Sequence, residues 1–282
     1  MLPSLATGQS QGTAFASAAL ASNPGCSIQT VECLRSLRVQ QILDNPIFPS
    51  PLVDGFVLPL SLQAAVLARQ FNQVPVINGT NHDEARFMVA MNELAGQVVT
   101  AAQYLAALAA AFGPEAGSRV LAEYPLSSYT NADEALAAIQ TDSSFACPAR
   151  LADQALSRFV PVFAYEFNDE DAPEIFLPAV SYPYGAAHGS ELQYFFPAED
   201  LTHLPEPPEQ LRADQRKLSE MMMRYWSQFA KEGDPNGPQT PAWPKYAPSL
   251  DKFQSLAPSS IATESGFATS HHCFFWAKFF TQ

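Results

Sequence analysis

Two short apolar runs along the chain have the pattern of buried β-strands. The segment "VPVING", residues 74–79, is apolar and β-branched and ends at a glycine. The segment "FVPVFAYEF", residues 159–167, is a second and clearer run of the same kind. Between them, "TAAQYLAALAAAFGP", residues 100–114, is predicted to form a helix that stops at Gly113 and Pro114.

A strong amphipathic helix is predicted further along the chain, ending near Gly233. Its apolar positions follow helical spacing: Leu218, Met221, Met222, Tyr225, Trp226 and Phe229. Residues 252–280 are predicted to contain short extended pieces and many aromatic side chains. Strands separated by helices and long loops indicate an α/β fold. Only two or three strands stand out in 282 residues, so we expect an incomplete sheet.

The net charge of the chain is unfavourable for binding nucleic acids. The chain carries 28 acidic and 15 basic residues, for a formal charge of −13, and this surface repels nucleic-acid phosphates. No apolar run reaches the roughly 18 residues of a membrane span. The first residues, "MLPSLATGQSQG", lack the basic and apolar regions of a signal peptide. The length fits one large or two ordinary domains.

The four cysteines, Cys26, Cys33, Cys147 and Cys273, leave two interpretations open. They are either four buried free thiols or two disulfides formed in an oxidising compartment, and we favour the disulfides. Disulfides favour a secreted or extracellular protein. That location conflicts with the missing signal peptide, and an incomplete N-terminus would resolve the conflict.

Polar residues follow the first predicted strand directly. His82, Asp83 and Glu84 stand after "VPVINGTN", where functional groups of open α/β sheets gather. Asp and Glu also favour the first turn of a helix, because they interact well with its dipole. On physical grounds alone the two interpretations are equally good.

A histidine in a loop of small residues is the second candidate. His188 lies between Gly185 and Gly189, where small neighbours leave its ring open to approach, although a lone histidine is more often structural. Glu191 lies close enough in sequence to orient the ring. Neither this pair nor the run of His271, His272 and Cys273 makes a convincing metal site, because a third ligand is missing or adjacent side chains diverge. We expect no metal or other cofactor.

Gly8, Ser10 and Gly12 spell the Gly-x-Ser-x-Gly pattern of a nucleophile elbow. An elbow needs a buried strand before the serine and a helix after it. Only the short segment "MLPSLAT", which contains Pro3, precedes the pattern, and it cannot form a central strand. We therefore expect Ser10 not to be a nucleophile.

Several motifs together resemble the C-terminal half of a type-B carboxylesterase, of the carboxylesterase/lipase family that includes the cholinesterases. The resemblance covers almost the whole chain. Its motifs are "GCSIQTVECLRSL", "PLVDGFVLP", "VPVINGTNHDEARF", "GAAHGSELQYFF" and "WSQFAKEGDPNG" followed by "WPKY". Each motif alone is moderately specific, and their common order makes the resemblance strong.

This resemblance implies an α/β-hydrolase fold and a Ser-His-Glu mechanism for hydrolysing carboxylic esters. Residues 1–282 would be the C-terminal portion of a single domain, with Glu84 as the triad acid and His188 as the general base. Glu191 would be structural. The implied disulfides are Cys26–Cys33 and Cys147–Cys273.

The chain departs from the family where the nucleophile should be. The family's Gly-Glu-Ser-Ala-Gly-Gly segment and its Gly-Gly oxyanion loop do not occur, so the N-terminal strands, the elbow and the oxyanion loop are missing. "QSQGTAF" resembles a segment downstream of the family's nucleophile, which makes Ser10 a non-catalytic serine. We expect a small-molecule ester substrate but little activity from this chain alone. The alternative is a non-catalytic binding or adhesion module, and the oligomeric state is left open.

Overall fold

The computed structural model describes residues 2–21, 31–47, 50–202, 204–205 and 209–280. The chain divides into two compact units, Met1–Phe71 and Asn72–Gln282, here called the N-terminal and the C-terminal unit. A single domain over residues 1–282 stays a prediction.

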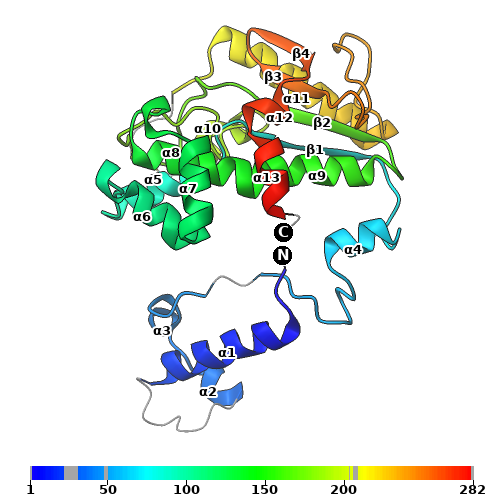
Figure 1. The fold of residues 1–282 in the computed structure, drawn as a ribbon. Helices are drawn as coiled ribbons and strands as arrows, with labels where there is room; N and C mark the ends of the chain where they lie inside the picture. Colours follow the sequence, from blue (N-terminus) through cyan, green and yellow to red (C-terminus); the bar gives the residue numbers. More distant parts are fainter. Residues whose placement is uncertain (1, 22–30, 48–49, 203, 206–208, 281–282) are drawn as a thin grey trace. The chain divides into compact units, whose positions relative to one another are not determined.

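The described part of the N-terminal unit contains helices and connecting loops (Figure 1). Its helices are α1 (Leu5–Leu20), α2 (Val31–Arg35), α3 (Val39–Leu43) and α4 (Leu62–Leu67). Ser4 starts α1 by accepting a hydrogen bond from the Thr7 backbone N–H at 3.2 Å, as an N-cap residue does. Ser4 also forms an isolated parallel bridge with Val53.

The C-terminal unit is built on a four-stranded mixed sheet with the order β1-β2-β3-β4. The strands are β1 (Val76–Asn81), β2 (Val162–Phe167), β3 (Phe253–Ala257) and β4 (Ser260–Glu264). The pairs β1–β2 and β2–β3 are parallel, whereas β3 and β4 form an antiparallel hairpin. This sheet with helices on it is the α/β architecture predicted from the sequence.

Helices cover both faces of the sheet (Figure 1). On one face, α11 (Ala213–Glu232) packs Leu218, Met222 and Tyr225 against the Phe163 and Phe167 side chains of β2. On the other face, α9 (Cys147–Leu156) lies along β1 and β2. Side chains of successive strand residues point to opposite faces, so each strand contributes to both layers.

The remaining helices precede α9 or follow β2. They are α5 (Arg86–Leu94), α6 (Ala101–Phe112), α7 (Pro114–Glu123), α8 (Ala132–Thr141), α10 (Ala198–Leu201), α12 (Phe267–Ser270) and α13 (Cys273–Phe280). Short η segments cover Leu126–Ser128, Asp142–Ala146 and Leu192–Tyr194. No helix among the described residues combines the length and the apolar character that crossing a membrane requires.

Local signals correctly predicted two of the helices, α6 and α11. The helix predicted over residues 100–114 is α6, and the amphipathic helix ends as predicted at Gly233, whose φ is +70°. Residues 252–280 contain the short extended pieces predicted there, β3 and β4, and the helices α12 and α13, which were not predicted, follow them. Aromatic residues favour strands, but Trp276 is buried and donates a hydrogen bond to the Tyr124 hydroxyl at 2.6 Å, so tertiary packing overrides this preference.

Candidate active site

Glu84 and His188 meet at the carboxyl ends of β1 and β2. Glu84 lies between β1 and α5, and His188 lies in the loop that follows β2. His188 Nδ1 lies 2.6 Å from Glu84 Oε2. The two strands are neighbours and parallel, so the segments that leave them start at the same edge of the sheet.

The Glu84 carboxylate is held in place from its own turn. Its Oε1 accepts hydrogen bonds from Thr80 Oγ1 and from the Asn81 backbone N–H, both at 2.9 Å. Its Oε2 is directed at His188, so the proton of the neutral imidazole belongs on Nδ1 and the lone pair on Nε2. The hydrogen bond that His188 donates to Glu84 raises the pKa of His188, against a smaller opposing effect of burial.

The imidazole is accessible and the carboxylate is not. The His188 side chain is 51% exposed, whereas that of Glu84 is 10% exposed. The aromatic rings of Phe87 and Phe145 lie near the imidazole, with centroids 6.3 Å and 5.8 Å from that of His188. A group from outside can therefore reach the His188 ring but not the Glu84 carboxylate.

The side chain of Asn81 connects the two loops, a role that sequence reasoning missed. Its Nδ2 donates to the Ala187 carbonyl at 2.8 Å and to Glu191 Oε2 at 2.5 Å. Burial raises the pKa of Glu191. Glu191 thus accepts from Asn81 and fixes the loop of His188, which fits the structural role that the resemblance implies.

Gly185 is required where the same two loops come closest. Its φ is +61°, and a Cβ at this position would lie 2.2 Å from Asp83 Oδ2. Asp83 accepts a hydrogen bond at Oδ2 from the Ala186 backbone N–H at 3.1 Å and pairs with Arg86 at 3.1 Å. Only glycine allows the loop to approach Asp83 this closely.

Ser10 does not lie in an elbow. Gly8, Ser10 and Gly12 all lie within α1, and Ser10 is exposed on that helix. An elbow requires a sharp turn from a strand into a helix, and here the serine has helix on both sides. The local geometry therefore lacks the strained turn that presents a nucleophile.

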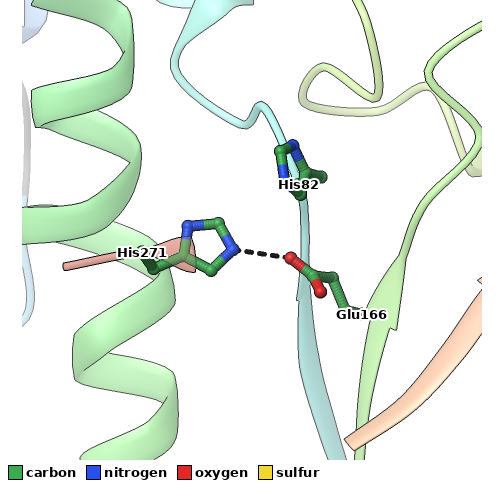
Figure 2. A group of neighbouring side chains, drawn as sticks. All are labelled: His82, Glu166 and His271. Atoms are coloured by element: carbon green, nitrogen blue, oxygen red, sulfur yellow. Dashed lines mark hydrogen bonds and ion pairs between the residues drawn. The ribbon is translucent and has the colours of Figure 1, made fainter. Parts of the chain in front are cut away.

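A second group of titratable side chains lies nearby, at the end of β1, on β2 and in the C-terminal tail: His82, Glu166 and His271 (Figure 2). His271 is buried between two carboxylates, with Nδ1 2.6 Å from Asp142 Oδ1 and Nε2 2.5 Å from Glu166 Oε1. These two carboxylates raise its pKa to about 10, although burial opposes the shift. Sequence reasoning missed this group, but a glutamate inside the apolar run "FVPVFAYEF" was a usable signal.

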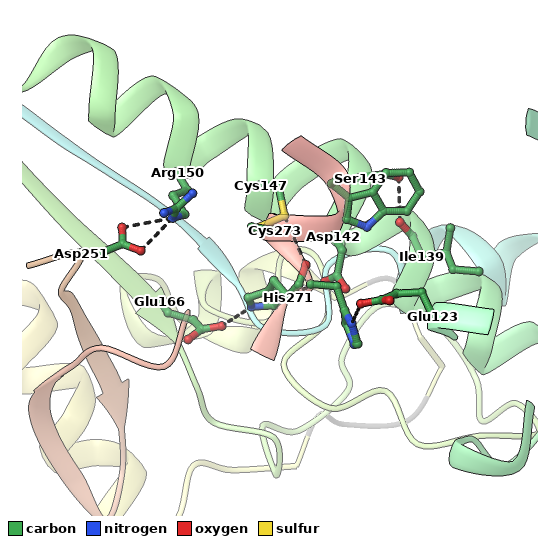
Figure 3. Close-up of a disulfide and its surroundings, with 12 residues drawn as sticks. Glu123, Ile139, Asp142, Ser143, Cys147, Arg150, Glu166, Asp251, His271 and Cys273 are labelled. Atoms are coloured by element: carbon green, nitrogen blue, oxygen red, sulfur yellow. Dashed lines mark hydrogen bonds and ion pairs between the residues drawn. A yellow bond between two sulfur atoms is a disulfide. The ribbon is translucent and has the colours of Figure 1, made fainter. Parts of the chain in front are cut away.

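The neighbours of His271 in the sequence turn elsewhere, as we predicted for adjacent side chains. His272 Nδ1 lies 2.7 Å from Glu123 Oε1. Cys273 forms a disulfide with Cys147, which joins α13 to the first residue of α9 (Figure 3). Cys26 lies outside the described residues, so the Cys26–Cys33 pairing stays a prediction.

Comparison with known proteins gives one consistent result. A model of the carboxylesterase family matches residues 2–276. The chain is 26% identical to an acetylcholinesterase of Bungarus fasciatus over 89% of this chain and 44% of that protein. It is 28% identical to a cocaine esterase of Homo sapiens over 89% of this chain and 46% of that protein. It is 27% identical to a carboxylesterase 5A of Canis lupus familiaris over 80% of this chain and 41% of that protein. The chain thus spans less than half the length of these relatives.

Proposed function

The chain belongs to the carboxylesterase family, and from this premise we propose that it supplies the general base and the orienting acid of an ester hydrolase. His188 is the base, and Glu84 is the acid that holds it. The observation that carries the proposal is the 2.6 Å contact between His188 Nδ1 and Glu84 Oε2, which leaves the other ring nitrogen free to react. The substrate is a small-molecule carboxylic ester.

In the proposed reaction, His188 Nε2 takes the proton of a serine hydroxyl as its oxygen attacks the ester carbonyl. Glu84 stays ionised and stabilises the imidazolium through Nδ1–H. The imidazolium then gives its proton to the leaving alcohol, and an acyl-serine remains. A water molecule, deprotonated by the same nitrogen, attacks the acyl group, releases the acid and restores the serine.

We propose that the serine belongs to a segment outside these 282 residues and that the chain alone is inactive. Ser10 matches the motif only in its letters, because it lies inside α1. A base without a nucleophile and an oxyanion site lacks the groups that form and stabilise the tetrahedral intermediate.

Fluorophosphonate labelling tests this proposal in two polypeptides. The first is the chain of 282 residues, and the second is the same chain extended by the coding sequence that precedes residue 1. We expect no adduct on the first and one adduct, on a serine of the added segment, in the second. His188→Gln lowers esterase activity of the extended protein roughly 10⁴-fold or more, and His272→Gln, a matched control on a half-exposed histidine paired with a glutamate, leaves it unchanged.

Two results would refute parts of this proposal. An adduct on Ser10 of the short chain would make the chain a self-sufficient hydrolase. An extended protein that takes up ester ligands without hydrolysing or being labelled would instead support the binding or adhesion module.

We further propose that the protein is secreted, since the Cys147–Cys273 disulfide persists only in an oxidising compartment. Intact mass after thiol alkylation, before and after reduction, tests this directly. Protein recovered from the culture medium should show four protected thiols. Protein found only inside cells with free thiols would contradict the proposal.

A further inference from the structure

The cluster of His82, Glu166 and His271 has no part in the proposed hydrolysis. One ligand atom from each side chain lies within 4.8 Å of those of the other two (Figure 2). Two histidine nitrogens and one carboxylate oxygen form a donor set typical of zinc, with water in the fourth position. We propose that these three side chains bind one Zn²⁺ ion. This inference does not depend on the proposed esterase activity.

The three ligands come from segments that the fold holds together. Glu166 is in β2, and His82 directly follows β1, where its backbone N–H donates to the Phe167 carbonyl at 3.1 Å. His271 ends α12, two residues before the disulfide-bonded Cys273. A metal ion at this point would connect two neighbouring strands with the C-terminal helices.

Each ligand has a polar group on its outer side, as ligands in metal sites usually do. Asp142 Oδ1 lies 2.6 Å from His271 Nδ1, which leaves Nε2 for the metal. Asn168 Nδ2 donates to Glu166 Oε2 at 3.2 Å, which leaves Oε1. Asp83 Oδ1 lies 3.3 Å from His82 Nδ1.

The charges around His271 also fit a divalent cation. Two buried carboxyl groups, Asp142 and Glu166, contact the two ring nitrogens of the single His271 side chain. Zn²⁺ bound by a neutral His271 would balance both of them. Binding exchanges the proton between His271 Nε2 and Glu166 Oε1 for the metal, and that proton leaves to solvent.

The adjustment needed to close the site is small. Tetrahedral bonds of 2.0–2.2 Å set ligand atoms roughly 3.3 Å apart. The His271–Glu166 contact of 2.5 Å must therefore open by less than about 1 Å, and His82 must move inward by roughly 1.5 Å or less. The His82 side chain is 30% exposed, and its Nδ1 lies 3.3 Å from Asp83 Oδ1, so this long contact constrains the ring only weakly.

Titration with zinc sulfate after treatment with a chelator tests the site. We expect the wild-type chain to bind one equivalent of Zn²⁺. His82→Gln should weaken the affinity at least tenfold, as should Glu166→Gln. His272→Gln is the matched control, because its side chain is 32% exposed against 30% for His82, and it should bind as the wild type does.

X-ray absorption at the zinc edge provides a second measurement, with two imidazole nitrogens expected among the ligands. His82→Gln changes a partly exposed side chain, so the test does not depend on whether the buried Glu166→Gln variant folds. Failure of the wild type to bind zinc would overturn the proposal and leave the cluster as a buried ion pair. Equal binding by wild type and His82→Gln would also overturn it, by placing the metal elsewhere.

Discussion

Asp153 of α9 is a buried carboxyl group whose charge should make the stability of the chain depend on pH. It is 0% exposed, its Oδ1 accepts from Asn78 Nδ2 of β1 at 2.9 Å, and its Oδ2 has no hydrogen-bond partner among the described residues. Burial raises the pKa of Asp153 to about 8, and the hydrogen bond from Asn78 opposes this only in part. We consider the substitution Asp153→Asn, which keeps the size and the Oδ1 acceptor.

The sign of the effect follows from the two pKa values. An unfolded aspartate has a pKa of about 3.9, so between that pH and about 8 only the folded state keeps the proton. The free energy of unfolding therefore falls as the pH rises, by roughly 1.4 kcal/mol per pH unit. From pH 5 to pH 7 the wild type should lose roughly 3 kcal/mol relative to Asp153→Asn, which has no such proton.

Urea unfolding followed by tryptophan fluorescence at pH 5, 6 and 7 measures this difference. Asp171→Asn is a suitable control, because its side chain is 82% exposed and should leave the wild-type pH profile unchanged. The difference between wild type and Asp153→Asn must grow with pH. Parallel profiles would show that Asp153 does not change its protonation on unfolding in this range, and would refute the reasoning.

Three further outcomes are expected. Removing the Cys147–Cys273 disulfide by paired alanine substitutions should lower the free energy of unfolding by roughly 5 kcal/mol, because the two residues are 126 apart in sequence; a change below about 1 kcal/mol in urea unfolding would contradict the chain-entropy estimate. The NMR-titrated pKa of His188 should lie above 6.5 in the wild type and fall in Glu84→Gln, and an unchanged value would remove Glu84 as the cause. Gly185→Ala should cost roughly 1–3 kcal/mol of stability, measured by the same unfolding assay, because its φ is +61°; wild-type stability would show that the loop relaxes freely.

The parts of the fold that the sequence predicted correctly depend on neighbouring residues. α6 has helix formers along its length and stops at Gly113, and α11 has one apolar face and ends at Gly233, whose φ of +70° suits glycine. β2 was recognised from one apolar run. In each case the signal lies within a single segment, so no knowledge of the tertiary structure was needed.

The parts that were missed depend on residues far apart in the sequence. α13 has an aromatic composition that favours strands, and it becomes helical where Trp276 packs under Tyr124. His271 meets Asp142 across 129 positions and Glu166 across 105. A pattern within one segment does not show which distant residue a side chain contacts. The motifs around Glu84 and His188, by contrast, singled out both residues from the sequence.

The two faces of the strands β1 and β2 carry different kinds of side chain. On β2, Phe163, Tyr165 and Phe167 point toward α11 and pack with Trp243 and their other aromatic neighbours. Alternate residues point the other way, and there the side chains include polar ones. A period of two therefore gives β2 an aromatic layer on one side and a polar side chain, Glu166, on the other.

The side chains that point away from α11 include polar ones, and each of these contacts a residue from a later part of the chain. Asn78 meets Asp153, Thr80 meets Glu84, and Glu166 meets His271. The groups that contact Asp153 and Glu84 differ in the charge that they can carry. Burial raises the pKa of Asp153, which receives a single neutral donor, whereas Glu84 contacts the imidazole of His188, which can become a cation. Along one sheet face, the number and kind of neighbouring donors thus distinguish the carboxyl group of Asp153 from that of Glu84, which contacts the imidazole of His188.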